Sequence, residues 1–175
     1  MQKLKTFEIQ RITADEFKKT QKIPLIIVLD NVRSLHNVGS VFRTCDAFLL
    51  EKILLCGITS TPPNAEIHKT ALGAEFSMAW QYFENISDAI QMLKEQDFTI
   101  ISVEQAQGST KICDFRCEQG KKYALVFGNE VKGVQQQVVS NSDFCIEIPQ
   151  FGTKHSLNVS VAAGIVIWEM FGQLK

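Results

Sequence analysis

Short apolar runs alternate with amphipathic stretches along most of this chain. The apolar runs are rich in branched side chains, which is the pattern of strands that are buried on both faces of a sheet. We expect strands at residues 25–29, 52–56, 78–83, 98–103, 123–127 and 144–148. Between them, apolar residues at helical spacing predict helices at residues 37–49, 87–96, 134–140 and 157–171, with a short helix or turn at 67–74.

The helix predicted at 37–49 has a clear apolar stripe. Its members recur at helical spacing and are Val38, Val41, Phe42, Cys45, Phe48 and Leu49. Arg43 lies off this stripe, so its side chain is expected to point away from the core.

The last predicted helix, residues 157–171, is apolar nearly all round. Asn158, Ser160 and Glu169 are its main polar exceptions. A helix with so little polar surface has to be covered on two sides. We expect its own sheet to cover one side and the partner in a homodimer to cover the other.

The N-terminal residues predict a short extension before the main domain. Thr13 and Glu16 have the spacing of a capping box, which opens a helix that runs to about residue 22, and Pro24 ends it. The 175 residues suit one well-buried domain. We therefore expect an extension with one helix at 1–24 and a single domain at 25–175.

Strands that alternate with helices predict an α/β fold with a mainly parallel sheet flanked by helices. Ligands of such sheets bind beyond the carboxyl ends of the strands. Here those ends are followed by loops at 30–37, 128–133 and 149–158, which concentrate polar residues and glycine. The polar segment 105–120 is expected to be an irregular, mobile loop.

Charge and cysteine content narrow the possible classes. Eighteen basic and nineteen acidic residues give a net charge of −1, so the chain lacks the overall basicity of many nucleic-acid-binding proteins, although a local basic patch stays open. Five scattered cysteines indicate reduced thiols, and one close pair, Cys113 and Cys117, is too little for a zinc site. Without an apolar signal region or a run long enough to span a bilayer, we expect a cytoplasmic protein that uses neither membrane nor metal.

Several common motifs are missing from the sequence. It has neither the glycine-rich dinucleotide motif GxGxxG, nor a GxxxxGK[ST] phosphate loop, nor an HExxH zinc site. Asp30 at a strand end would suit a phospho-acceptor domain, but no matching aspartate ends a middle strand. The notable residues of the three loops also have structural explanations when they are taken singly. Asn37 suits a helix cap, and Arg43 suits a solvated side chain. Gly128 and Asn129 suit a turn, and Ser156 and Asn158 suit a helix start.

Taken together, three blocks resemble a known family. They are LDNVRSLHNVGSVFRTCDAF at 29–48, LVFGNEVKGV at 125–134 and IPQFGTKHSLNVSVAAG at 148–164. In order and spacing they are similar to the three motifs of the SpoU/TrmH branch of the SPOUT superfamily, S-adenosylmethionine-dependent RNA ribose 2′-O-methyltransferases. The similarity spans residues 25–172. Gln150 departs from the methionine that many members have at this position, and no proposed role depends on it.

The resemblance implies a deep trefoil knot in the C-terminal half, which general rules of chain connection would not suggest. It implies a dimer through the helix at 157–171. It also implies that S-adenosylmethionine lies between the loops after two strands, held by Phe127, Gly128, Asn129, Ile148, Pro149, Gly152, Ser156 and Leu157.

The resemblance further implies an active site made of Asn37, Arg43, Glu130, Ser156 and Asn158. Transfer to a ribose hydroxyl needs positioning and proton removal. In the family the arginine is the proposed base, but a guanidinium does not readily give up its proton. Our hypothesis is that Arg43 holds an RNA phosphate and orients the hydroxyl, while that phosphate or water assists proton loss.

We therefore expect an RNA 2′-O-methyltransferase that acts on transfer RNA, because short extensions flank one catalytic domain. Three alternatives stay open. One is ribosomal RNA as substrate, a second is a noncatalytic RNA-binding domain that keeps the fold, and a third is a methyltransferase that acts on a hydroxyl outside RNA.

Overall fold

A computed structural model describes residues 1–5 and 8–175; residues 6 and 7, in the predicted N-terminal extension, lie outside the described part. The chain forms a seven-stranded sheet in the order β3-β2-β1-β6-β4-β7-β5. All of its neighbouring strands pair in parallel. The strands are β1 (Ile23–Asp30), β2 (Leu50–Cys56), β3 (Trp80–Phe83), β4 (Phe98–Val103), β5 (Thr110–Lys111), β6 (Lys122–Phe127) and β7 (Phe144–Glu147).

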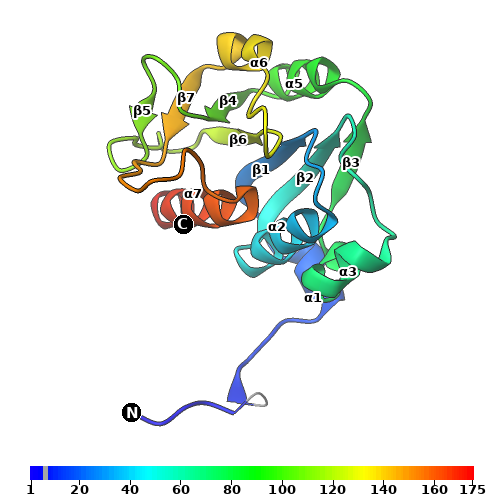
Figure 1. Ribbon diagram of the computed structural model, residues 1–175. Coiled ribbons are helices and arrows are strands. Elements are labelled where there is room, and N and C mark those ends of the chain that lie inside the picture. Colours follow the sequence, from blue (N-terminus) through cyan, green and yellow to red (C-terminus); the bar gives the residue numbers. More distant parts are fainter. Residues whose placement is uncertain (6–7) are drawn as a thin grey trace.

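Helices cover both faces of the sheet, as Figure 1 shows. They are α1 (Ala14–Lys19), α2 (Leu35–Ala47), α3 (Ala65–Ala71), α4 (Ala74–Ser77), α5 (Ile86–Glu95), α6 (Gln136–Asn141) and α7 (Val159–Leu174). The core cluster on one face joins β1 to α2 and α7, and the cluster on the other face joins it to α5 and α6. The predicted α/β fold with a parallel sheet is therefore confirmed.

The central strands are buried on both faces because each one lies between two helical layers. In β1, Leu25, Ile27 and Leu29 pack into one core cluster, while Ile26 and Val28 pack into the other. Burial of each such side chain contributes about 1.5–3 kcal/mol. This two-sided burial explains why the strands are continuous apolar runs in the sequence.

Several predicted boundaries differ from the structure. The second helix begins at Leu35 rather than at residue 37, because Ser34 caps it by accepting a hydrogen bond from the Asn37 amide. The segment 67–74 is divided between α3 and α4, with Leu72 and Gly73 in the left-handed conformation between them. The last helix begins at Val159 rather than at 157.

The expectation of an irregular loop at 105–120 is wrong in part. It contains the edge strand β5, which pairs with β7. Ile112 and Phe115 are buried in the core. Two apolar side chains spaced three residues apart within a polar segment were too weak a signal to predict this anchoring. The predicted mobility of the remaining residues stays a prediction.

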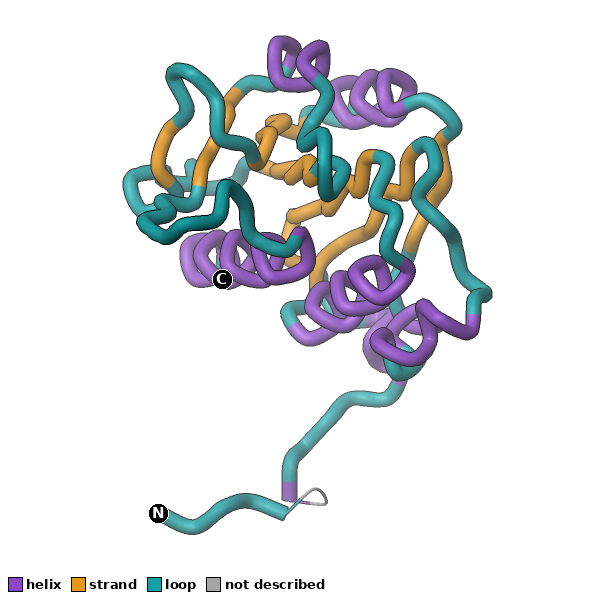
Figure 2. Tube along the Cα trace, viewed as in Figure 1, coloured by secondary structure: helices purple, strands orange, loops and turns teal. Residues whose placement is uncertain are grey.

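The N-terminal segment leads away from the body of the molecule, as the tube trace shows (Figure 2). The predicted capping box is confirmed: the Thr13 hydroxyl accepts from the Glu16 amide, and the Glu16 carboxylate accepts from the Thr13 amide. Helix α1 is anchored by Phe17, which belongs to the main core cluster. Along the part of the chain that is described, no helix has the length and apolarity needed to cross a membrane.

Candidate functional site

Loops that follow the first, sixth and seventh strands meet at one edge of the sheet. β1 and β6 are direct neighbours, and β7 lies beyond β4 in the same parallel sheet. Parallel strands end at the same edge, so residues distant in sequence become neighbours there. The loops after β1, β6 and β7 therefore lie in contact with one another.

Glu130, in the loop after β6, reaches across to the loop after β1. Its Oε2 accepts a hydrogen bond from the Arg33 amide at 3.0 Å, and its Oε1 accepts from the Ser34 amide at 2.9 Å and from Asn37 Nδ2 at 3.1 Å. Burial opposes ionisation, but these hydrogen bonds outweigh it and lower the pKa of Glu130 below its ordinary value. Glu130 is therefore an anion that ties two loops together.

Asn37 extends this network to the start of α7. Its Oδ1 accepts from Asn158 Nδ2 at 3.1 Å and from the Ser160 hydroxyl at 3.4 Å. Asn158 also caps α7, because its Oδ1 accepts from the amides of Ser160 and Val161. The alternative that Asn37 is a helix cap is wrong, since Ser34 has that role. The alternative that Asn158 starts a helix is confirmed, in addition to its bond to Asn37.

The loop after β6 is shaped by a close backbone approach. Asn129 and Gly133 exchange two backbone hydrogen bonds, of 3.1 and 2.9 Å. A Cβ atom on Gly128 would lie 2.1 Å from the carbonyl carbon of Gly133, so a glycine is required there. Asn129 Nδ2 donates to the carbonyl of Asn31 at 2.8 Å, which fixes the turn against the end of β1.

Asp30, at the end of β1, is buried at 1% exposure. Its two carboxylate oxygens accept from Gln135 Nε2 at 3.1 and 3.0 Å, and Oδ1 also accepts from Asn31 Nδ2. Burial raises the pKa of Asp30, although these hydrogen bonds act in the opposite direction. Because Gln135 lies in the loop after β6, its hydrogen bonds to Asp30 connect that loop to β1.

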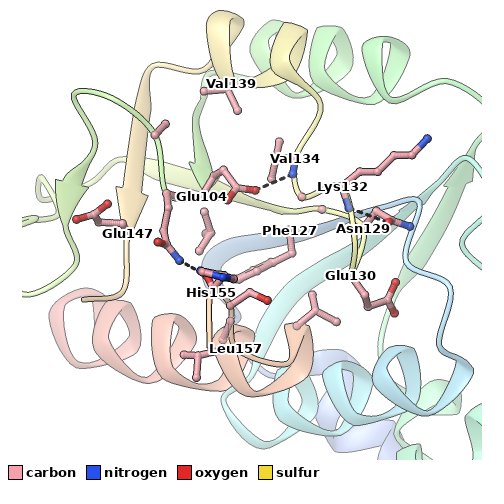
Figure 3. Close-up of a pocket in the computed structure, with 18 of the residues that line it drawn as sticks. Glu104, Phe127, Asn129, Glu130, Lys132, Val134, Val139, Glu147, His155 and Leu157 are labelled. Atoms are coloured by element: carbon pink, nitrogen blue, oxygen red, sulfur yellow. Dashed lines mark hydrogen bonds between the residues drawn. The ribbon is translucent and has the colours of Figure 1, made fainter. Parts of the chain in front are cut away.

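A cavity of about 830 Å³ opens between the loops after β4, β6 and β7. Figure 3 shows Phe127, Asn129, Glu130, His155 and Leu157 around it. Its volume lies within the range of about 300–1,000 Å³ that is typical of small-molecule sites. The wall combines apolar side chains with carboxylates and exposed loop backbone. The apolar residues are Val103, Ala106, Phe127, Val131, Val134, Val139, Ile148, Leu157, Val159 and Ala162, and the charged residues are Glu104, Glu130, Lys132 and Glu147.

Most of the residues predicted to hold the cofactor line this cavity. They are Phe127, Gly128, Asn129, Ile148, Ser156 and Leu157. Pro149 lines an adjoining hollow of about 170 Å³. Gly152 lines neither space. The structure thus brings the two predicted loops to one cavity, while the binding role of each residue stays a prediction.

The predicted catalytic residues form three groups according to where they lie relative to the cavity. Glu130 and Ser156 line the cavity. Asn37 and Asn158 are joined to Glu130 by the hydrogen bonds described above. Arg43 lies further along α2 and is exposed, and it makes no hydrogen bond or ion pair to the part of the chain that the structure describes. Its catalytic role stays a prediction.

The sequence patterns did not point to the part of the cavity wall that directly follows β4, which includes Glu104 and Gln105. They predicted a separate polar loop at 105–120. The signal was present, because the rule that placed sites at the carboxyl ends of the other strands applies equally to β4. The roles of the Arg33 and Ser34 amides could not be found from side-chain patterns.

The chain matches a known protein family over most of its length. A model described as the SpoU rRNA Methylase family matches residues 24–168. A 23S rRNA (guanosine-2′-O-)-methyltransferase of Neisseria meningitidis serogroup B is 31% identical over 155 residues, which is 89% of this chain and 61% of that protein. A tRNA/rRNA methyltransferase of uncharacterised function from Borreliella burgdorferi is 35% identical over 92% of this chain and 69% of its own length.

A similar solved structure is that of an AdoMet-bound rRNA methyltransferase from Sinorhizobium meliloti. It has a TM-score of 0.82 and 27% sequence identity, and the match covers 91% of this chain and 60% of that protein. The chain thus spans about 60–69% of the length of these relatives. The fold is shared with the Sinorhizobium structure, the family match spans all three sequence blocks, and parts of the relatives extend beyond the match.

Proposed function

The chain belongs to the SpoU rRNA methylase family, and from this membership we propose that it transfers a methyl group from S-adenosylmethionine to a ribose 2′-hydroxyl of RNA. The observation that carries the proposal is the cavity between the loops after β4, β6 and β7, beside which Glu130, Asn37 and Asn158 are joined in one network. Support for 2′-O-chemistry comes from the name of the Neisseria relative.

The residues of the cavity fit S-adenosylmethionine in size and chemistry. Apolar side chains, including Phe127, Ile148 and Leu157, suit an adenine ring, and the backbone of 128–133 offers polar partners to it. Among the charged side chains of the wall, the Glu147 carboxylate suits the positive charge of a sulfonium or an ammonium group. When bound, S-adenosylmethionine supplies an electrophilic methyl group.

In this proposal the protein's own residues position the ribose and let its proton leave. Glu130 holds the loop after β1 through the Arg33 and Ser34 amides, so the start of α2 keeps a fixed place beside the cavity. Ser156 and Asn158 supply hydrogen-bonding groups to the ribose. Arg43 binds an RNA phosphate through its forked guanidinium and orients the ribose hydroxyl. The proton of this hydroxyl passes to that phosphate or to water.

The proposed protein is a homodimer that pairs through α7. This helix exposes three large apolar side chains, Val161, Ile165 and Trp168, the last at 63% exposure. Trp168 and Phe171 stack beside Phe48, the residue that follows α2, which extends the apolar surface. Contiguous apolar surface of this kind marks protein interfaces.

Three further parts of the proposal concern the chain as a whole. The catalytic domain spans 25–175 after an extension at 1–24. The protein works in the cytoplasm, and its five free cysteines suit a reducing compartment. The C-terminal part is threaded as a deep trefoil knot. Support for the knot comes from α7, which follows β7 near the sheet edge yet packs back against β1 and α2.

The proposed substrate is transfer RNA, with ribosomal RNA as a second candidate that the names of the Neisseria and Sinorhizobium relatives favour. The test is to incubate the purified protein with methyl-labelled S-adenosylmethionine and, separately, transfer RNA and ribosomal RNA, and then to map 2′-O-methyl positions. Transfer to either RNA at a 2′-hydroxyl supports the proposal. Cofactor binding without transfer to any RNA would instead indicate a noncatalytic RNA-binding domain.

A further inference from the structure

The two residues that follow β4 contact both of the loops that face each other across the cavity. Glu104 contacts the loop after β6, and Gln105 contacts the loop after β7. We propose that Glu104 and Gln105 are positioning residues that clasp these loops at a fixed separation and thereby set the affinity for S-adenosylmethionine. This inference rests on the proposed function and adds a role for residues outside the three sequence blocks.

Glu104 is fitted closely to the loop after β6. Its Oε2 accepts from the Val134 amide at 2.9 Å (Figure 3). Its Oε1 accepts from the backbone amide of Gln105 at 2.9 Å. A Cβ atom on Gly133 would lie 2.1 Å from Oε2, and Gly133 has a φ of +66°. The carboxylate therefore occupies space that a glycine in a left-handed turn leaves open.

Gln105 holds the loop after β7. Its Nε2 donates to the carbonyl of His155 at 2.8 Å. Among the hydrogen bonds of the described residues, this is the one that involves the segment 149–157. Most of that segment is exposed, so it has little packing to fix it. Loss of this bond should therefore free the loop far more than loss of one bond in a packed region would.

Glu104 and Gln105 directly follow β4, and Glu104 is itself anchored on the sheet. The Glu104 amide donates to the Ile146 carbonyl at 3.0 Å, and the Cys145 thiol donates to the Glu104 carbonyl at 3.5 Å. Both partners belong to β7, which pairs with β4. A rigid base with one side chain directed to each loop is the arrangement needed to fix the width of a cavity.

The experiment measures S-adenosylmethionine affinity by calorimetry in the full chain, together with thermal unfolding and the rate of trypsin cleavage after Lys154. Gln105→Glu keeps the side-chain size but removes the donor, and we expect affinity to fall about five- to tenfold. Cleavage after Lys154 should become at least about threefold faster, with the unfolding midpoint within about 2 °C. Gln119→Glu, which makes the same charge change at an exposed residue without hydrogen bonds to the described chain, should match the wild type.

Glu104→Ala should weaken binding by a similar factor, while Glu104→Gln, which retains one acceptor oxygen for the Val134 amide, should weaken binding less than Glu104→Ala. In steady-state kinetics, the KM of Gln105→Glu for S-adenosylmethionine should rise about five- to tenfold, and its turnover at saturating cofactor should fall by a smaller factor. Wild-type binding together with unchanged affinity and cleavage in Gln105→Glu would overturn the inference. A wild-type protein that does not bind S-adenosylmethionine would contradict the proposed function itself, and the inference with it.

Discussion

The side-chain amide of Asn37 donates a hydrogen bond to the carboxylate of Glu130 across 93 residues of sequence, at 3.1 Å. Asn37 is buried at 8% exposure, so each of its polar atoms needs a partner. The same side chain accepts from Asn158, and the three residues join the loops after β1, β6 and β7. Substitutions in this network should therefore affect stability and methyl transfer to different extents, depending on which hydrogen bond is lost.

Replacement of Glu130 should destabilise the protein in a pH-dependent manner. A glutamine there has one acceptor oxygen for the Arg33 and Ser34 amides, so Glu130→Gln should lower the free energy of unfolding by about 1–2 kcal/mol at pH 7. Because the folded pKa of Glu130 is lowered, its stabilisation is present above the ordinary value of 4.5 and is lost as pH falls through the folded value.

Urea unfolding of wild type and Glu130→Gln between pH 3 and 7 checks this result. The two curves should converge at the acid end of the range. The matched control is Glu84→Gln, an exposed position without hydrogen bonds to the described chain, which should follow the wild type throughout. A difference for Glu130→Gln that is constant over the whole pH range would contradict the ionic role of Glu130.

Two substitutions of Asn158 separate helix capping from the side-chain network. Asn158→Asp keeps an oxygen that accepts from the Ser160 and Val161 amides but cannot donate to Asn37. It should keep the helix cap and lose turnover about tenfold or more, whereas Asn158→Ala, which removes the cap as well, should be less stable than Asn158→Asp by about 1 kcal/mol. Unfolding by denaturant and methyl-transfer rates are the measurements. Equal turnover in Asn158→Asp and wild type would show that the bond to Asn37 is dispensable.

Gly128→Ala should distort the loop after β6. The added Cβ would lie about 2.1–2.2 Å from backbone atoms of Gly133 and Val134, so the loop must move. We expect a loss of about 2 kcal/mol or more in unfolding free energy and a marked loss of S-adenosylmethionine affinity. In the control Gly172→Ala, the new Cβ on α7 meets nothing within 4 Å, and the change should be neutral or slightly stabilising.

Arg43→Lys tests the forked phosphate clamp. The side chain is exposed and unpaired within the described chain, so stability should change by less than about 0.5 kcal/mol. Turnover should fall about tenfold or more across the pH range, because an ammonium group cannot make two parallel bonds to a phosphate. Arg11→Lys, another exposed arginine, serves as control. Near-wild-type turnover of Arg43→Lys at every pH would exclude the clamp.

Trp168→Glu should convert the proposed dimer into a monomer. The indole is 63% exposed and stacks with Phe171, so a charge there would be buried without a partner in the proposed interface. Sedimentation velocity at micromolar concentration reports the change. Ser87→Glu on α5, which packs on the opposite face of the sheet, should leave the assembly unchanged. A monomeric wild type would contradict the proposed dimer.

The sequence was sufficient for the layers of the fold, because burial on two faces leaves continuous apolar runs and burial on one face leaves helical stripes. Residues 98–103 are an example, since predicted strand and β4 coincide. Helix boundaries were predicted less well: the start of α2 depends on the Ser34 cap, and the helix predicted to run to about residue 22 and to end at Pro24 already ends at Lys19, while Pro24 lies within β1. The edge strand β5 is too short to leave a pattern.

For the site, the sequence by itself determined which residues are present and, through three ordered blocks, which family they belong to. The tertiary structure decided that Asn37, Glu130 and Asn158 are joined by hydrogen bonds, that Arg43 stands outside the cavity, and that Glu104 and Gln105 contact two loops at once. The physical reason is that these contacts span 30 to more than 120 residues. Distances of that kind are set by strand order and loop path, which leave no local pattern in a sequence.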